Sequence, residues 1–255
     1  MGLLDGKVVI VTGGGHGIGK AYCRGIAREG GTIIVADIDE KAAYDVAAKA
    51  IQDSGGKALG IYLDVAQLAS CQRMAEKTLQ AFGKIDGLVN NAAIFMSVPA
   101  EKGGWQEITE EAWDRIMAVN VKGLWLCSRA VVPAMQQRKP GSVVNISSNM
   151  AFNGGLTMMH YVVSKAAVVG FSRVLARELG SDNIRVNTLA PGSTLSEEQP
   201  TEQAMQNYQR TASARILKRI ERPDDLVGTA LYLLSDLSTF VTGQTILVNG
   251  GAVLH

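Results

Sequence analysis

Residues 8–19 read Val-Val-Ile-Val-Thr-Gly-Gly-Gly-His-Gly-Ile-Gly, and this stretch decides the fold. Its first five residues are apolar or β-branched, which is typical of a strand buried on both faces. Glycines let the backbone turn sharply and approach a ligand closely, and the first turn of a helix offers unpaired N–H groups to an anion. A glycine cluster can be only a tight turn. Between a buried strand and a helix, however, it predicts a binding site for the pyrophosphate of a dinucleotide.

Short β-branched runs alternate with longer amphipathic runs outward from this turn. The expected strands are residues 8–12, 32–37, 58–63, 85–90, 142–147, 184–189 and 245–248. The expected helices are residues 18–29, 40–54, 68–82, 110–137, 161–179 and 224–234. This alternation favours right-handed βαβ units. The sequence therefore predicts an α/β class, a doubly wound Rossmann fold in which a seven-stranded parallel sheet has helices on both faces.

The domain organisation is expected to be simple. No linker or low-complexity tract interrupts the alternation, so we predict a single dinucleotide-binding domain over residues 1–255. One stretch, residues 191–215, lacks a clear period and is rich in Ser, Thr, Glu and Gln. Long polar excursions from compact α/β domains are often active-site lids, and we predict a substrate lid here.

Composition and charge exclude several classes of function. The formal charge is +1, and the most basic run, residues 215–222, has apolar residues at helical spacing. We interpret that run as one face of a surface helix, and we expect no nucleic-acid partner. The three cysteines are scattered, which indicates neither a disulfide framework nor a metal site. Residues 1–7 lack a long apolar segment, and no stretch is apolar enough to cross a membrane, so we expect a cytoplasmic protein.

A carboxylate at the end of the second predicted strand bears on coenzyme choice. Asp37 can accept hydrogen bonds from both hydroxyls of an adenosine ribose and would repel a 2′-phosphate, so we predict NAD rather than NADP. Asp37 can instead cap the next helix, but Asp39 is placed to do that. His16 is the counter-argument, because a cation beside the phosphates would tolerate NADP. As a neutral imidazole it carries no charge, and we rank it second to Asp37.

Two residues in a later helical run carry the predicted chemistry. Tyr161 and Lys165 are four residues apart and therefore share a helix face. The ammonium favours phenolate, so we expect it to lower the pKa of the tyrosine toward neutrality. Such a tyrosine can exchange a proton with an alcohol or a carbonyl compound. On its own the spacing is weak, since the same pair occurs by chance on many solvated helices.

Together these motifs resemble the short-chain dehydrogenase/reductase family, in its single-domain form and over nearly the whole chain. The family's Thr-Gly-x-x-x-Gly-x-Gly pattern begins at Thr12, and its Asn-Asn-Ala-Gly motif begins at Asn90 with Ala93 in place of glycine. Its Tyr-x-x-x-Lys pair and Pro-Gly dipeptide are also present. The resemblance implies a catalytic set and, by spacing from the tyrosine, selects Ser148 over a structural Ser147. The implied catalytic residues are Ser148, Tyr161, Lys165 and Asn120.

The resemblance also assigns roles. Tyr161 is the expected general acid and base, Lys165 lowers its pKa and binds ribose hydroxyls, Ser148 holds the substrate oxygen, and Asn120 orders a water. Asp64 is expected at the adenine, Pro191 and Gly192 at the nicotinamide, and Thr194 or Ser196 at the carboxamide. The expected coenzyme contacts are Gly13, Gly15, His16, Gly17, Ile18, Gly19, Asp37, Ile38, Asp64, Val65, Asn91, Ala92, Tyr161, Lys165, Pro191, Gly192 and Thr194. No metal is expected, because the three histidines do not form a ligand set.

The substrate is less well specified. Apolar residues near the catalytic set suggest a small secondary alcohol or ketone, although core or subunit packing explains them nearly as well. The candidate pocket residues are Phe95, Trp105, Met150 and Met158. The alternatives are an enzyme similar to a 3-oxoacyl-(acyl-carrier-protein) reductase and a non-catalytic dinucleotide sensor. The resemblance further implies a homotetramer, in which Trp125, Cys127 and Met135 would be buried between subunits.

Overall fold

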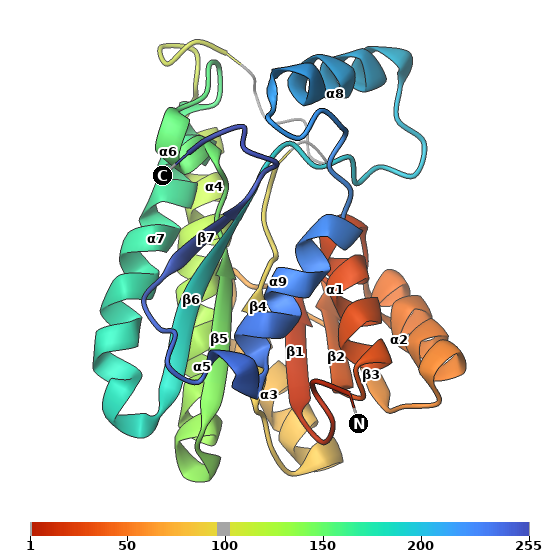
Figure 1. The fold of residues 1–255 in the computed structure, drawn as a ribbon. Helices are drawn as coiled ribbons and strands as arrows, with labels where there is room; N and C mark the ends of the chain where they lie inside the picture. Colours follow the sequence, from red (N-terminus) through yellow and green to blue (C-terminus); the bar gives the residue numbers. More distant parts are fainter. Residues whose placement is uncertain (1, 96–102, 255) are drawn as a thin grey trace.

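The computed structural model describes residues 2–95 and 103–254 and contains the predicted parallel sheet (Figure 1). The strand order is β3-β2-β1-β4-β5-β6-β7, and all neighbouring strands pair in parallel. The strands are β1 Val8–Thr12, β2 Thr32–Asp37, β3 Ala58–Tyr62, β4 Gly87–Asn90, β5 Gly141–Ile146, β6 Ile184–Pro191 and β7 Thr245–Val248. The seven-stranded Rossmann fold predicted from the sequence is confirmed.

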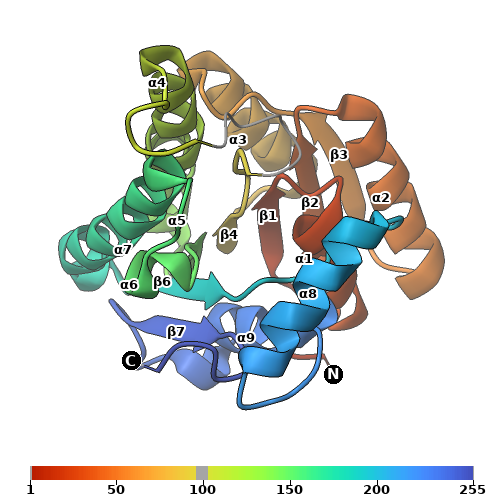
Figure 2. The same cartoon turned by 90° about the horizontal axis from the view of Figure 1, so that it is seen from above.

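Helices cover both faces of the sheet (Figure 2). Their bounds are α1 Gly17–Arg28, α2 Glu40–Ser54, α3 Leu68–Phe82, α4 Glu110–Met117, α5 Leu124–Arg138, α6 Met150–Asn153, α7 Met159–Leu179, α8 Glu202–Ala214 and α9 Asp224–Leu234. Helices α1, α2 and α9 contribute to one core cluster, which we call the α1–α9 core. Helices α3, α5 and α7 contribute to the other, which we call the α3–α5 core. The long helical run predicted for residues 110–137 is continuous, but a π-helical segment, Ala118–Gly123, separates α4 from α5.

The continuously apolar strands explain the two cores. All five residues of β1 are buried. Successive side chains of a strand point to opposite faces, so Ile10 packs into the α3–α5 core while Val9 and Val11 pack into the α1–α9 core. Both faces of the sheet are thereby removed from water, which is the usual setting of a parallel sheet.

The strand order reverses between β1 and β4, and this point is held together by side chains. Thr12 Oγ1 accepts hydrogen bonds from the backbone N–H groups of Asn91 and Ala92, each at 3.0 Å. The Asn91 amide donates back to the carbonyls of Thr12 and Gly13, also at 3.0 Å. In doubly wound sheets ligands bind in the crevice outside the carboxyl ends of the strands at such a reversal.

The segment predicted to be an aperiodic lid contains a regular helix. Helix α8 occupies the second half of residues 191–215 and lies at the top of Figure 1, beyond the sheet. Thr201 caps it by accepting a hydrogen bond from the N–H of Ala204. The surface helix predicted for residues 215–222 is wrong, because these residues are not helical. Arg215 is buried in an ion pair instead, whereas Ile216 and Leu217 are exposed.

Two residues expected between subunits lie inside the chain's own core. Cys127 and Met135 are buried in the α3–α5 core, which corrects that expectation, whereas Trp125 is 45% exposed. Within the described ranges, no helix is long and apolar enough to cross a bilayer.

Replacing Thr12 with Val should destabilise the fold. Valine has nearly the same shape but no acceptor, so the N–H groups of Asn91 and Ala92 would lose their partner. We expect the free energy of unfolding to fall by roughly 2 kcal/mol, measured by urea denaturation. Thr32→Val in β2 is the matched control, since the Thr32 hydroxyl makes no hydrogen bond with a described residue. Equal stability of the two variants would contradict this role of Thr12.

Candidate active site

The glycine turn after β1 has the conformation and the donors that an anion site needs. Gly13 and Gly17 adopt positive φ values of 63° and 47°, which side chains other than glycine rarely tolerate. A Cβ on Gly19 would collide with the Gly13 carbonyl. Helix α1 begins at Gly17 with neither a side-chain cap nor an acidic residue in its first turn, in contrast to α2, α4 and α8. Its first N–H groups therefore fit a pyrophosphate.

Two aspartates lie at the end of β2: Asp37 is its last residue, and Asp39 is the helix cap that the sequence predicts. Asp39 caps α2 by accepting a hydrogen bond from the N–H of Ala42 at 3.0 Å, and its other oxygen lies 3.0 Å from His16 Nε2. These contacts lower the pKa of the Asp39 carboxyl, the N–H of Ala42 having the largest effect. Asp37 is buried at the strand end and accepts the N–H of Gly15 at 2.9 Å. A carboxylate has further lone pairs, so Asp37 can still accept hydroxyls.

Ser148, Tyr161 and Lys165 meet at the carboxyl end of β5, and all three are buried. Lys165 Nζ donates a hydrogen bond to the carbonyl of Ile146 at 2.9 Å and lies 5.8 Å from the centroid of the Tyr161 ring. Tyr161 and Ser148 share a hydrogen bond. The Phe95 ring packs against Tyr161 with the centroids 4.7 Å apart. The structure thus brings the predicted catalytic pair and the selected serine together.

The protonation of this pair differs from the prediction. Burial raises the pKa of Tyr161 to about 12, although its hydrogen bond with Ser148 acts in the opposite direction. Burial also lowers the pKa of Lys165 to about 8. The expected lowering of the tyrosine pKa by Lys165 is therefore wrong for the protein by itself. Removal from water has the largest effect on the pKa of both groups. Lys165 Nζ lies over the phenol ring and donates its hydrogen bond to a backbone carbonyl.

Asn120 joins the site to the loop after β4. It is buried in the π-helical segment, a feature that is common at functional sites. Its Oδ1 accepts the N–H of Ile94 at 2.8 Å, and its Nδ2 donates to the Ile94 carbonyl and to Ser164 Oγ. Both amide hydrogens are therefore used by the protein. Ser164, on the same helix as Tyr161, was not singled out from the sequence.

Ser147 has the structural role that the sequence predicts for it. Its hydroxyl donates to the backbone carbonyl of Lys165 at 2.7 Å and fixes α7 against the end of β5. Asn91 likewise contacts the glycine turn through its side chain, as described above, and Ala92 is held by Thr12.

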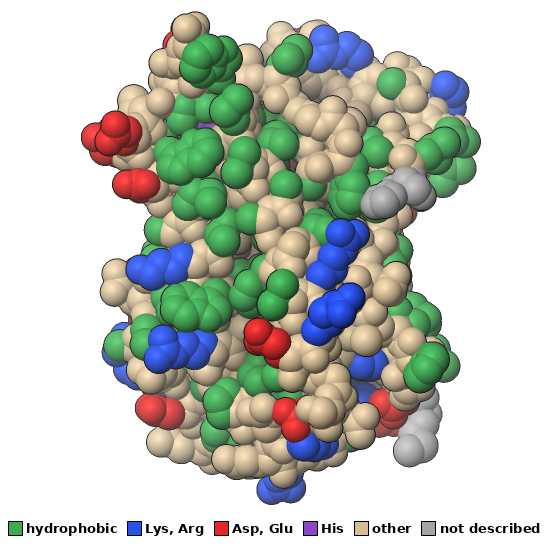
Figure 3. Space-filling view, turned by 90° about the vertical axis from the view of Figure 1, so that its left-hand side faces the viewer, with side chains coloured by type: hydrophobic (Ala, Val, Ile, Leu, Met, Phe, Trp, Pro, Cys, Tyr) green, Lys and Arg blue, Asp and Glu red, His purple; other side chains and the backbone are tan. Residues whose placement is uncertain are grey.

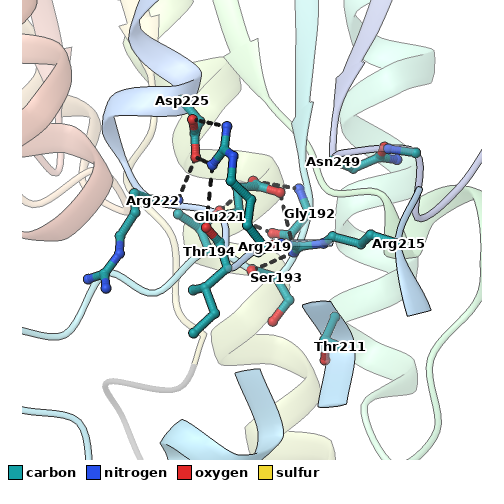
Figure 4. Close-up of polar contacts among 12 residues, drawn as sticks. Gly192, Ser193, Thr194, Thr211, Arg215, Arg219, Glu221, Arg222, Asp225 and Asn249 are labelled. Carbon is teal, nitrogen blue, oxygen red and sulfur yellow. Dashed lines mark hydrogen bonds and ion pairs between the residues drawn. The ribbon is translucent and has the colours of Figure 1, made fainter. Parts of the chain in front are cut away.

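The segment after β6 is held by two residues that sequence reasoning missed (Figure 4). The N–H of Gly192 and the hydroxyl of Thr194 both donate to Oε1 of Glu221, at 3.1 and 2.7 Å. Glu221 pairs with Arg215 at 3.3 Å, and both side chains are buried. Burial raises the pKa of the Glu221 carboxyl, whereas Thr194 and Arg215 act to lower it. The sequence carried no clear signal, because both residues lie in a run that looks like a solvated helix.

The remaining predicted contacts are spread along the same edge. Asp64 and Val65 follow β3, where Asp64 accepts the N–H of Ala66 at 2.9 Å and Val65 packs into the α3–α5 core. Ile38 follows Asp37 and is 66% exposed. Pro191 is the last residue of β6.

The candidate pocket residues fall into two groups. Phe95 lies against Tyr161, and Met150 donates its N–H to Ser148 Oγ at 3.2 Å. Met158 is half-buried at the start of α7. Trp105 instead lines a cavity of about 340 Å³ with Ile108, Thr109, Glu110, Trp113, Asp114 and Met159. That lining includes none of the catalytic candidates, so Trp105 as a substrate contact stays a prediction.

Comparisons with known proteins match this chain to reductases and dehydrogenases. A family model described as enoyl-(acyl carrier protein) reductase matches residues 13–253. The 3-oxoacyl-(acyl-carrier-protein) reductase of Thermotoga maritima is 38% identical over 98% of this chain and 99% of its own. Cyclopentanol dehydrogenase of a Comamonas species is 34% identical over 98% of each chain. A solved short-chain type dehydrogenase/reductase from Mycobacterium marinum is 32% identical, covers 99% of this chain and 97% of its own, and has a TM-score of 0.90.

Lys165→Met should stabilise the protein, and more so at pH 7 than at pH 10. The pKa of Lys165 is depressed to about 8, so folding favours the neutral amine, and the penalty on stability is fully present below pH 8. That penalty disappears as the pH rises toward the unfolded pKa of 10.5. Urea denaturation should show a gain of roughly 1 to 3 kcal/mol at pH 7 that shrinks by pH 10. A gain independent of pH would contradict the burial of an ionisable Lys165.

Proposed function

The chain belongs to the short-chain dehydrogenase/reductase family of oxidoreductases, which use nicotinamide dinucleotides, and from this premise we propose that it transfers a hydride between NAD(H) and a small apolar secondary alcohol or ketone. One observation supports this reaction above the others. Ser148, Tyr161 and Lys165 are buried together at the carboxyl end of β5. A proton donor, an oxygen-binding hydroxyl and a cation are thereby available at one place.

The coenzyme would be held along the carboxyl edge of the sheet. The N–H groups at the start of α1 suit its pyrophosphate, and Asp37 suits the adenosine ribose. Asp64 and Val65 are assigned to the adenine, and the segment from Pro191 to Thr194 to the nicotinamide. When bound, the coenzyme supplies the carbon that gives or accepts the hydride.

Tyr161 moves the proton. With a pKa of about 12 its phenol stays neutral, which is the form that donates a proton to a ketone oxygen during reduction. Alcohol oxidation needs the reverse transfer and therefore favours the phenolate. Two positive charges promote it, the Lys165 ammonium and the pyridinium ring of the oxidised coenzyme. The Lys165 pKa of about 8 keeps most of its amine charged at neutral pH.

Ser148 and Asn120 support this transfer. The Ser148 hydroxyl is anchored by the N–H of Met150 and by Tyr161, so it can hold the substrate oxygen and stabilise charge that develops there. Asn120 fixes the Ile94 loop beside Tyr161 and contacts Ser164, which directly precedes Lys165 on α7. In this proposal it positions the site, and any ordered water would bind near it.

The substrate assignment rests on the apolar surroundings of Tyr161, chiefly Phe95. The two relatives are named for different substrates, a 3-oxoacyl-(acyl-carrier-protein) and cyclopentanol. A reductase of the first kind is the second candidate, supported by the 38% identity. Asp37, buried against the glycine turn, favours NAD and with it the first candidate. A sensor without catalysis is disfavoured, because the whole catalytic set is present.

We also propose a homotetrameric, cytoplasmic enzyme. Hydrophobic side chains gather on the side of the molecule where α7 lies in Figure 1, and Figure 3 shows this side directly. Exposed members on α5 and α7 are Trp125, Met159, Val163 and Val174, between 38% and 57% exposed. Exposed apolar side chains gathered on one side favour contact with another protein surface, which supports self-association.

Tyr161→Phe should abolish turnover without abolishing coenzyme binding. Loss of the phenolic proton should lower kcat by about 100-fold or more, measured as NADH formation at saturating alcohol. The affinity for NADH, measured by its fluorescence, should change by less than about three-fold, since the ring is kept. Tyr44→Phe on the exposed face of α2 is the control. Undiminished turnover of Tyr161→Phe would refute the proposed role.

Asp37→Asn should weaken the choice of NAD over NADP. The Asp37 carboxylate accepts the N–H groups of both Gly15 and Asp39, and the amide keeps one acceptor oxygen for them but removes the charge that repels a 2′-phosphate. We expect the ratio of dissociation constants for the two coenzymes to shift toward NADP by about ten-fold. Asp39→Asn, two residues further along the chain on an exposed cap, should leave the ratio unchanged. Tighter binding of NADP by the wild type would overturn the reading of Asp37.

A further inference from the structure

A buried ion pair lies beneath the segment that follows β6 (Figure 4). Glu221 and Arg215 are only 5% and 2% exposed. Oε1 of Glu221 accepts the Gly192 N–H and the Thr194 hydroxyl, while Arg215 donates to the Ser193 carbonyl at 2.7 Å. Three consecutive residues are thus held by one pair.

The backbone adds to this attachment. Thr194 and Glu221 form an isolated parallel bridge, and the N–H of Leu195 donates to the Glu221 carbonyl at 2.9 Å. Arg215 directly follows α8, and Glu221 precedes α9. The pair therefore joins the end of the α8 excursion to the strand end at the proposed nicotinamide position.

The pair determines what the Thr194 hydroxyl can do. A hydroxyl has a single hydrogen, and Thr194 Oγ1 lies 2.7 Å from Glu221 Oε1 and 3.2 Å from the Gly192 carbonyl, both of which are acceptors. The hydrogen must point toward that side. The oxygen is left with lone pairs only, so toward a ligand Thr194 is an acceptor.

A buried pair of this kind is a poor way to gain stability. Removing two charges from water is expensive, and hydrophobic residues of similar volume often serve as well. The neighbouring Arg219–Asp225 pair, at 2.6 Å, is part-exposed, and its side-chain hydrogen bonds join the two residues to each other, to Ile220 and to Arg222. A function in positioning explains why the buried pair is placed where it is.

We propose that Glu221, fixed by Arg215, is a positioning residue that holds the Thr194 hydroxyl as an acceptor for the N–H₂ of the nicotinamide carboxamide. This inference rests on the proposed function. It adds a residue and a direction to the hydrogen bond: the carboxamide presents its nitrogen, not its oxygen, to Thr194.

Coenzyme analogues test this directly through binding without substrate. The reduced 3-acetylpyridine analogue of NADH has a methyl group where the carboxamide has N–H₂, so it cannot donate to Thr194. Isothermal titration calorimetry should show the wild type binding NADH about five-fold more tightly than the analogue. Arg215→Met combined with Glu221→Leu avoids leaving an unpaired buried charge, and it should reduce this preference to about two-fold or less.

Three further variants separate a positioning role from a purely structural one. Glu221→Gln keeps an acceptor oxygen and should retain most of the preference. Thr194→Val removes the acceptor and should lose the preference even if the double variant does not fold. Asp225→Asn in the exposed neighbouring pair should match the wild type.

The outcomes separate a failure of the proposed function from a failure of the inference about Glu221 and Thr194. If the wild type binds neither NADH nor NADPH, the proposed function fails. If the wild type binds NADH without preferring it over the analogue, or if Thr194→Val keeps the preference, the inference is overturned while the proposed function stands. If the double variant binds NADH and the analogue more weakly by the same factor, the preference is kept. The ion pair then has only a structural role, and the inference is likewise overturned.

Discussion

The requirement that buried polar groups find partners determines the carboxyl edge of this sheet. Thr12 satisfies the N–H groups that follow β4, Asn120 satisfies both backbone groups of Ile94, and Lys165 donates to the carbonyl of Ile146. Each of these side chains is thereby tied to the end of a strand or to the loop that leaves it. The reversal of strand order opens the edge, and these hydrogen bonds give it a fixed shape. A site built this way is preorganised by backbone contacts, not by loops alone.

The same burial sets the protonation of the site. Lys165 bonds to a carbonyl, and no carboxylate is among its hydrogen-bond partners in the described residues, so its charge is poorly compensated. Tyr161 is equally shielded and keeps its proton. In the proposed enzyme, the state of this pair depends on the charge of the bound coenzyme. Glu221 is the contrasting case, since Arg215 compensates its buried charge locally.

The fold could be read from the sequence because its signals are local. Continuous apolar runs identify the strands, and Asp39 and Gly55 mark the ends of α2 at the predicted residues. The placement of Ser148 beside Tyr161 followed from the family's spacing. The ion pair of Arg215 could not be predicted, because apolar residues at helical spacing imitate a surface helix and the partners come from tertiary structure. The raised pKa of Tyr161 could not be predicted either, since the sequence pattern shows the nearby ammonium but not the loss of water.

The central claim is that burial keeps Tyr161 protonated until the positive charge of the oxidised coenzyme favours its phenolate. Ultraviolet difference spectra of wild type minus Tyr161→Phe, recorded between pH 7 and about pH 10 with and without saturating NAD⁺, test this claim directly. We expect no tyrosinate signal from Tyr161 in the free protein and one tyrosinate appearing within this range when NAD⁺ is bound. A tyrosinate already present in the free protein, or none in the presence of bound NAD⁺, would contradict it.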